Sequence, residues 1–519
     1  MITFVKKYKV GLLILTGSLI LAVTMFKSGV RYSFGVGFWG ANGHDGIWHI
    51  ALAKGLARGS LDMPIMSGEK IKNYHLGFDL LLAGLHIITR IPMTTLYFQI
   101  LPIVFSVLIG LLTYRLTKNL WSVFFVYFGG SLGWVWGGGE SMFWSQQSIS
   151  TLINPPYALS LIFMLWGLLL IQQKKYWWAG IVFAILPHIK IYAGILSFAG
   201  LLIAGFKDRN LFKTFGLGLS IYLISNFQSL ISGVKILEWQ PGWFLETMMA
   251  LSDRFNWPKF YEAMINYKAA KNFLKGISAY AVAFVIFLVG NMSTRLLSLF
   301  EFSQKNIFYY TVIVWGVVIP MFFVQKGTAW NTVQFFYYSL FFTGILAGEN
   351  IQRFSKLIKT TVVVLTLPTT WLALAHYLPL RPPAMIANVE LEALKFLENQ
   401  PKGIVLVPFF EGKDSPPPRP LYDYESTAYV AAYSNNPTFL EDEVNLNITG
   451  YDWLSRRKEV ITFWETRDTS WAKEFLFRNN IRYLYLSQIA NNRPVVDLKS
   501  VGMRNIFENS QVSIWSRQL

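Results

Sequence analysis

Long apolar runs recur through the first 380 residues, and they constrain the fold of this 519-residue chain more than any other feature. A run of about 20 apolar residues crosses a hydrocarbon core about 30 Å thick as a helix, because a helix satisfies its own backbone hydrogen bonds in lipid. The chain is therefore predicted to be an α-helical polytopic membrane protein. The runs that reach or approach this length, several of them short, are 10–26, 75–89, 97–113, 120–137, 157–173, 177–187, 190–206, 211–228, 275–290, 308–324, 334–348 and 359–379.

The composition changes near residue 384. From there to the end the chain carries 17 acidic and 15 basic residues, whereas the preceding 383 residues carry a net charge of +19. Only 14% of the whole chain is charged, against roughly 25% in soluble proteins, so the deficit lies in the first part. This split predicts a transmembrane domain over 1–383 and a small α/β domain over 384–519.

The tail alternates helix and strand patterns. Amphipathic helices are predicted at 391–398, 451–465 and 471–479, and β-strands at 403–408 and 481–486. The last segment, 505–515, has the pattern of a β-hairpin that turns at Asn509-Ser510. The tail has no metal-ligand spacing, catalytic triad or phosphate-binding loop of its own.

Basic residues between the apolar runs predict the orientation, because positively charged loops stay on the cytoplasmic side. The chain is predicted to have eleven or twelve transmembrane helices. If 75–89 lies at the membrane surface or is only half embedded, eleven segments cross the membrane and all the basic flanking residues lie on the cytoplasmic side. The prediction is a multi-pass plasma-membrane protein with a cytoplasmic N-terminus, an extracytoplasmic tail and long outer loops at 27–74, 138–156 and 229–273. Because the basic excess is loop charge, no nucleic-acid partner is expected. The flanking residues are Lys6, Lys7, Lys9, Arg115, Lys118, Lys174, Lys175, Lys207, Arg209, Lys213, Arg295, Lys305, Arg353, Lys356 and Lys359.

The first outer loop contains a short helix pattern that begins with ionisable residues. Residues 46–56 fit a helix lying on the membrane surface, with Asp45 at its N-cap. Capping needs only one such residue, yet His44, Asp45, His49 and Lys54 all occur here. This loop is therefore a candidate site as well as a candidate cap.

A second group follows in the segment 73–86. One helix turn separates His75 from Asp79, and His86 lies two turns further on, so a continuous helix would place all three on one face. Ionisable residues in an apolar helix are functional candidates by default. The alternative is a His–Asp hydrogen bond that only docks this helix on its neighbours.

Two polar interruptions occur later in the apolar region. Pro187 breaks a long run and is followed by His188 and Lys190, which could hold a lipid phosphate, although simple snorkelling of Lys190 explains the lysine equally well. A second interruption, 326–335, contains Asn331. The chain has no cysteine, which excludes thiol nucleophiles and disulfides.

These elements together resemble the GT-C superfamily of membrane glycosyltransferases, which includes the protein O-mannosyltransferases. The similar features are Gly43-His44-Asp45-Gly46 entering a helix, Tyr74-His75-Leu76 before an apolar helix, the broken segment Pro187-His188-Ile189-Lys190, and the C-terminal α/β domain. The resemblance implies transfer of a hexose or pentose from a polyprenyl-phosphate carrier to a glycan, lipid or protein acceptor on the outer face of the membrane.

The resemblance also implies roles for the residues. Asp45 takes the place of the catalytic acidic residue, as general base or as a metal-assisting carboxylate. His188 and Lys190 would hold the departing phosphate, with His49 or His75 in support. Metal dependence stays open, with a divalent ion as the one candidate cofactor, because His44 and Gly46 flank Asp45 where the family often has a second acidic residue.

Two other functions remain open at this stage. A transporter or flippase of a lipid-linked or anionic substrate could use the same His and Asp residues, but no matching halves are found. A non-catalytic membrane scaffold could display the tail to bind envelope polymers. Loss of transfer on substitution of Asp45 distinguishes the enzyme from both.

Overall fold

The computed structural model describes residues 2–137, 139–226, 237–412, 416–487 and 493–517. The chain forms two compact units. The first unit contains Met1–Thr24 and Pro102–Leu378, and the second contains Met25–Leu101 and Pro379–Leu519. The segment after the first helix thus groups with the C-terminal region rather than with the remaining helices.

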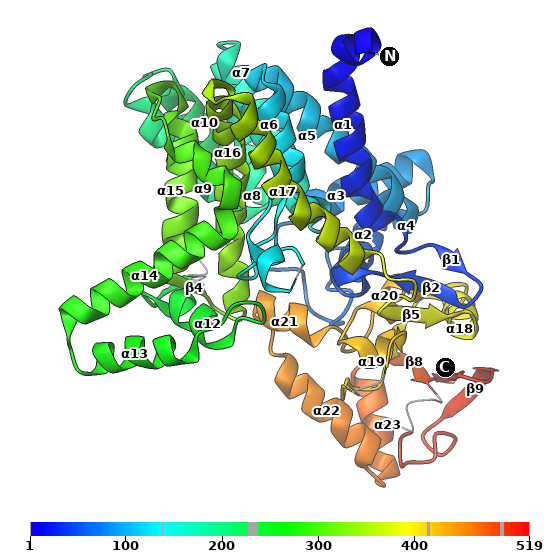
Figure 1. The fold of residues 1–519 in the computed structure, drawn as a ribbon. Helices are drawn as coiled ribbons and strands as arrows, with labels where there is room; N and C mark the ends of the chain where they lie inside the picture. The colour runs from blue at the N-terminus through cyan, green and yellow to red at the C-terminus, as the bar shows by residue number, and fades with distance from the viewer. Residues whose placement is uncertain (1, 138, 227–236, 413–415, 488–492, 518–519) are drawn as a thin grey trace. The chain divides into compact units, whose positions relative to one another are not determined.

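The first unit is a bundle of apolar helices (Figure 1). Helix α8 packs against α7 and α10, and α16 packs against α6 and α15. A two-stranded antiparallel sheet, β3–β4, lies beside the shorter helices α12 and α13. The helices and strands are α1 (Ile2–Phe26), α5 (Leu101–Thr117), α6 (Leu120–Phe128), α7 (Pro155–Gln172), α8 (Tyr176–Ile189), α9 (Ile191–Gly205), α10 (Leu211–Ser225), β3 (Leu237–Trp239), α12 (Trp243–Leu251), α13 (Pro258–Ala269), α14 (Phe273–Met292), α15 (Ile307–Phe322), β4 (Phe323–Gln325), α16 (Gln334–Asn350) and α17 (Lys356–Tyr377).

Six helices in the described part of the chain are long and apolar enough to cross a membrane: Tyr8–Phe26, Met93–Thr117, Pro155–Gln172, Phe273–Leu299, Gln304–Phe322 and Lys356–Tyr377. Helices α3, α8, α9 and α10 are apolar but shorter. The polytopic helical class is therefore confirmed, whereas the count of eleven crossings and their orientation stay predictions.

The predicted helix over 120–137 is wrong in its second half. Helix α6 ends at Phe128, and the chain turns at Gly129-Gly130 into a loop. A Cβ atom on Gly130 would lie 2.4 Å from Oγ1 of Thr369 on α17. The glycine therefore allows a close approach of this loop to α17, and apolar composition alone could not reveal that the helix stops.

Arg295, which the sequence predicts to flank a cytoplasmic loop, is buried, and the side of the membrane on which it lies stays a prediction. Arg295 is buried just after α14, and its guanidinium donates hydrogen bonds to the carbonyl oxygens of Gly130 and Asn291 at 3.1 Å and to Gln147 Oε1. A buried arginine satisfied by carbonyl and amide oxygens holds a loop to a helix end.

The second unit joins the first outer segment and the tail in one sheet, with strand order β1-β2-β5-β7. Strand β2 pairs antiparallel with β5, and β5 pairs parallel with β7. The strands are β1 (Arg31–Tyr32), β2 (Gly35–Phe38), β5 (Ala384–Ala387) and β7 (Arg419–Pro420). Gly35 has a φ of +133°, and a Cβ there would lie 2.0 Å from the Ile386 carbonyl oxygen, so only glycine fits this pairing.

The other sheet of this unit has the order β6-β8-β10-β9 and confirms the predicted tail elements. The parallel β6–β8 pair follows from two helix-then-strand units, and β9–β10 is the predicted terminal hairpin. The remaining elements of the unit are α2 (Asp45–Ala57), α3 (Gly77–Thr89), α4 (Met93–Thr95), a π-helical turn (Leu96–Ile100), α18 (Asn388–Glu398), β6 (Ile404–Leu406), α19 (Leu421–Tyr424), α20 (Tyr429–Ser434), α21 (Glu443–Thr449), α22 (Trp453–Glu465), α23 (Thr469–Arg478), β8 (Ile481–Ser487), β9 (Met503–Glu508) and β10 (Val512–Arg517).

Helix α2 does not lie on a surface as predicted. Ten of its 13 residues are buried, and it packs between α3 and α20. A helix buried on nearly all sides must be apolar all round, and the polar residues at its N-terminus then lie where it meets the C-terminal region of the unit.

Candidate active site

The candidate site forms at the first residue of α2. The prediction that Asp45 caps this helix is wrong, because the helix begins at Asp45 and His44 occupies the cap position without a side-chain capping bond. The His44 carbonyl accepts from the backbone N–H groups of Ile47 and Trp48, each at 3.1 Å. Asp45 is instead the first residue of the helix, and its carboxylate lies at the positive end of the helix dipole.

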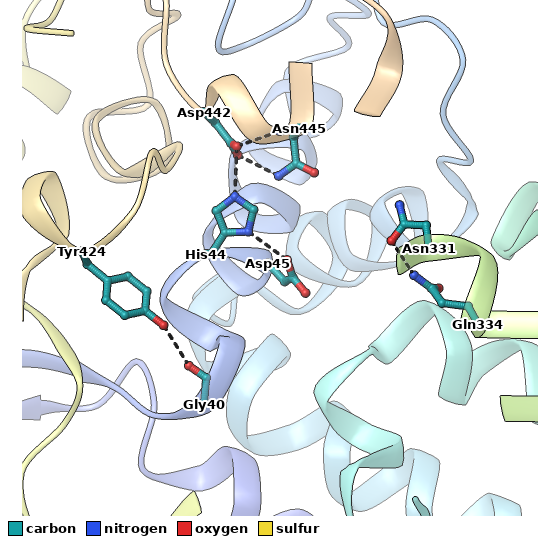
Figure 2. A network of polar contacts seen from close by, with 8 residues as sticks. All are labelled: Gly40, His44, Asp45, Asn331, Gln334, Tyr424, Asp442 and Asn445. Atoms are coloured by element: carbon teal, nitrogen blue, oxygen red, sulfur yellow. Dashed lines mark hydrogen bonds and ion pairs between the residues drawn. The ribbon is translucent and has the colours of Figure 1, made fainter. Parts of the chain in front are cut away.

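His44 lies between two carboxylates (Figure 2). Its Nδ1 is 2.9 Å from Asp45 Oδ1, and its Nε2 is 3.1 Å from Asp442 Oδ1. The side chain of Asp45 is 52% exposed, whereas that of Asp442 is fully buried and that of His44 nearly so. The buried imidazole of His44 therefore orients the accessible carboxylate of Asp45.

Asp442 is fixed in turn by its own backbone and by Asn445. It has a left-handed conformation (φ 50°, ψ 61°) and caps α21, where its carboxylate accepts from the Asn445 backbone N–H at 3.1 Å and from Asn445 Nδ2 at 2.9 Å. A non-glycine residue in this conformation is uncommon and points to a local constraint. The contact between His44 and the tail therefore rests on a rigid helix start.

The charges at this site favour a protonated His44. Burial by itself lowers the pKa of His44, but Asp442 and Asp45 more than offset that effect and hold the pKa well above its usual value. Burial raises the pKa of the nearby Glu425 carboxyl; His44 lowers it, and Asp45 and Asp442 raise it further. An imidazolium between two carboxylates leaves a net negative site.

Small and aromatic residues surround Asp45. A Cβ atom on Gly46 would lie 2.8 Å from the Phe98 ring and 3.2 Å from the Tyr97 ring, so the helix start is packed tightly against these side chains. The Tyr424 hydroxyl donates to the Gly40 carbonyl at 3.5 Å, which ties the tail to the turn before α2 (Figure 2). The site is therefore supported from both segments of the second unit.

A second His–Asp pair lies one turn along α2. His49 Nδ1 is 2.7 Å from Asp79 Oδ1 on α3, both residues are buried, and the His49 ring stacks on Tyr97 at 6.0 Å. This is the docking bond that the sequence left as the alternative for this helix, with His49 rather than His75 as the partner of Asp79.

The predicted stripe of His75, Asp79 and His86 on one helix face is wrong. Helix α3 begins at Gly77, so His75 precedes it and stacks on Tyr74 at 4.6 Å. His86 lies near the other end of α3, where its Nδ1 is 2.7 Å from the Ile91 carbonyl oxygen. The helix start could not be read from periodicity because the residues before Gly77 continue the same pattern.

The remaining candidates lie in the first unit. Lys190 is the extended residue between α8 and α9, which confirms the predicted break. It is buried, with its Nζ 3.4 Å from Asn154 Oδ1 and 5.5 Å from the centre of the Tyr192 ring. The Tyr192 hydroxyl donates to Gln325 Oε1 at 2.6 Å, so a polar cluster surrounds this lysine.

His188 and Asn331 have other neighbours. His188 Nε2 is 3.0 Å from Ser225 Oγ on α10, and its ring contacts Tyr222. Asn331 lies in the polar interruption between β4 and α16, where its Oδ1 accepts from Gln334 Nε2 at 2.9 Å (Figure 2). His188 and Lys190 therefore do not form a joint pair, although they are only two residues apart.

Sequence reasoning missed Asp442 and Glu425. The acidic run Glu441-Asp442-Glu443 is visible in the sequence, but nothing in it indicates that Asp442 meets a histidine almost 400 residues earlier. Such a long-range contact is decided by the pairing of β2 with β5.

No protein-family model matches the chain, and no curated protein matches it. Solved structures match by fold. The arabinofuranosyltransferase AftD from Mycobacteria matches 97% of this chain with a TM-score of 0.53 and 10% identity, and the match covers 41% of that protein. The oligosaccharyltransferase of Archaeoglobus fulgidus in its apo form matches 99% of this chain with a TM-score of 0.51 and 11% identity, covering 75% of that protein.

A third match, ArnT from Cupriavidus metallidurans bound to undecaprenyl phosphate, has a TM-score of 0.38 and 11% identity over 98% of this chain and 97% of that protein. The first two matches show that the fold of the chain is similar to those of the arabinofuranosyltransferase and the oligosaccharyltransferase. At these identities they show the fold alone, and the finer likeness to protein O-mannosyltransferases stays a prediction.

Proposed function

We propose that this protein is a membrane glycosyltransferase that moves a sugar from a polyprenyl-phosphate donor to an acceptor hydroxyl on the outer face of the membrane. The observation that carries the proposal is the accessible Asp45 carboxylate, held by the buried His44–Asp442 pair in a chain with the GT-C fold. The acceptor is a glycan, a lipid or a protein.

Exposure distinguishes Asp45 from the two other aspartates that contact the histidines of α2. Asp79 and Asp442 are each fully buried and hydrogen-bonded to a histidine, so neither can reach a substrate. Asp45 is half exposed at a helix start, which suits a carboxylate that must stay ionised to act as a base.

The proposed reaction needs one base and one phosphate-binding group. Asp45 accepts the proton of the acceptor hydroxyl while the oxygen of that hydroxyl forms a bond to the anomeric carbon of the sugar. The bond from that carbon to the phosphate oxygen breaks, and the lipid phosphate leaves with the electron pair. A positioned base contributes about 100- to 10,000-fold to such a step.

His44 positions Asp45 in this scheme. Its imidazolium donates to both carboxylates, which fixes the orientation of the accessible Asp45 side chain. The surrounding residues do not fit a metal site: both ring nitrogens of His44 already face carboxylates, and no group of three or more His, Asp or Glu residues in the described ranges could hold an ion. The proposed reaction therefore uses cationic side chains of the protein in place of a metal ion.

Lys190 is the proposed phosphate-binding residue. It is a cation at the break between two apolar helices, and its Nζ lies near the neutral side chains of Asn154 and Tyr192. Cations that hold the departing phosphate lower the barrier of this step.

Transfer in proteoliposomes tests the proposal. The purified full-length chain is supplied with undecaprenyl-phosphate hexoses and pentoses and a membrane extract as acceptor, and the transferred label is counted. We expect Asp45→Asn to reduce the rate by at least about 100-fold, because the amide cannot accept the proton.

The matched control is Asp497→Asn, which removes an exposed carboxylate near the C-terminus of the chain and should leave the rate unchanged. Transfer by Asp45→Asn at the wild-type rate would contradict the site assignment. Movement of the donor across the bilayer without sugar transfer would indicate a flippase instead.

A further inference from the structure

A cavity in the C-terminal part of the second unit adjoins the candidate site. Its empty volume is about 790 Å³, including space open to solvent. Its walls are residues 407–412 after β6, residues 421–429, residues 440–443 except Asp442, and the ends of α22 and β8. The wall residue Glu443 directly follows Asp442, and its backbone N–H donates to Ser426 Oγ at 2.9 Å.

Aromatic side chains cover much of the cavity wall. Phe409, Phe410 and Tyr422 are half-buried, whereas Tyr429 and Tyr485 are buried. The half-buried rings present apolar faces that a flat or ring-shaped ligand can cover. Apolar faces beside convergent polar groups are the usual composition of a ligand site.

The carboxyl groups of the cavity are less anionic than their number indicates. Glu443 is paired with Arg457, whose guanidinium also donates to the Phe410 carbonyl at 2.7 Å. Burial raises the pKa of Glu441 to about 8, and burial raises that of Glu425 as well. Glu411 and Asp423 also line the cavity, which therefore offers several carboxyl groups as hydrogen-bonding partners, one of them matched by an arginine.

The buried hydroxyl of Thr427 has no hydrogen-bond partner among the described residues. Thr427 is 4% exposed and lines the cavity, and its Oγ1 makes no hydrogen bond within the described residues. A buried hydroxyl without a partner costs free energy unless a ligand or water satisfies it. The hydroxyl therefore points independently to a bound polar ligand.

We propose that this cavity binds a neutral sugar residue of the acceptor. Aromatic faces match the apolar face of a sugar ring, and Thr427 with the carboxyl groups matches its hydroxyls. Glu425 links the cavity to the candidate base, because it lines the cavity and also interacts electrostatically with Asp45. This assignment rests on the proposed function and narrows its acceptor to a carbohydrate.

Binding without turnover tests the assignment. Saturation-transfer NMR on the detergent-solubilised full-length chain measures four neutral probes: the methyl glycosides of glucose, mannose, galactose and arabinose. We expect Thr427→Val and Phe410→Ala each to weaken binding about tenfold, the size of one lost hydrogen bond or ring contact.

Thr427→Val also has a diagnostic effect on stability. Because the hydroxyl has no partner among the described residues, its isosteric removal should leave the unfolding temperature unchanged or raise it. The matched control is Thr449→Val, whose buried hydroxyl donates to the Asn445 carbonyl at 2.6 Å. That variant should lose stability and keep the affinity for glycosides.

The outcomes separate the two proposals. Glycoside binding that survives in Asp45→Asn but falls in Thr427→Val supports the cavity whether or not the chain transfers sugar. The assignment is overturned if no glycoside binds, if both cavity variants bind as wild type does, or if only a cationic probe such as spermidine binds. Transfer that persists in Asp45→Asn contradicts the proposed function alone.

Discussion

The two His–Asp contacts of helix α2 use the same residue types and differ in access. His49 and Asp79 are sealed in the packing of α2 against α3, whereas His44 joins buried Asp442 to half-exposed Asp45. A sealed pair can only contribute to packing, and its removal leaves a buried group unsatisfied. The bridging arrangement leaves the Asp45 side chain half exposed, so access rather than residue type distinguishes the two contacts.

The largest expected difference is in activity. Asp79→Asn should keep the transfer rate within about threefold, because the amide still accepts from His49, while Asp45→Asn should lose at least about 100-fold. Initial rates in proteoliposomes, normalised to folded protein, measure both. Equal losses in the two variants would remove the distinction between the pairs.

Stability should show the opposite order. Asp79→Ala leaves His49 buried without its partner and should lower the free energy of unfolding by about 3 kcal/mol. Asp45→Ala removes a half-exposed carboxylate and should change it by less than about 1 kcal/mol. Thermal unfolding in detergent compares them, and a larger loss in Asp45→Ala would reverse our assignment.

Replacement of His44 should sharpen the comparison through pH. The folded pKa of His44 lies above its unfolded value, so the pair contributes its full stability below about pH 6.5 and loses it as pH rises through the raised pKa. His44→Gln should therefore be most destabilising, by about 1–2 kcal/mol, between pH 5 and 6.5. Unfolding midpoints across pH 5–10 measure this, and a constant difference between variant and wild type would contradict a charged bridge.

The smallest effect concerns the packing beneath the site. Gly46→Ala adds a methyl group against the Phe98 and Tyr97 rings and should destabilise the chain by about 1 kcal/mol. Gly55→Ala on the same helix meets no atom within 4 Å and serves as the control. Equal unfolding temperatures for the two variants would show that the helix start is not tightly packed.

Local sequence pattern was sufficient for several elements. The helix-then-strand units of the tail and the hairpin turning at Asn509-Ser510 are as predicted, because alternation and amphipathic spacing act within one segment. The break at Lys190 was also visible, since Pro187 and two polar residues interrupt an apolar run. The early end of α6 was not visible in the sequence, because glycines such as Gly129 and Gly130 also occur frequently within transmembrane helices.

The sequence by itself determined that this is a polytopic helical protein with a mixed C-terminal region, and it singled out Asp45 and its neighbouring histidines. Only the tertiary structure decided that His44 meets Asp442, that His49 rather than His75 meets Asp79, and that Asp45 stays accessible. Hydropathy and periodicity depend on neighbours within a few turns. Contacts between residues hundreds of positions apart depend on how strand β2 pairs with β5, which no local pattern encodes.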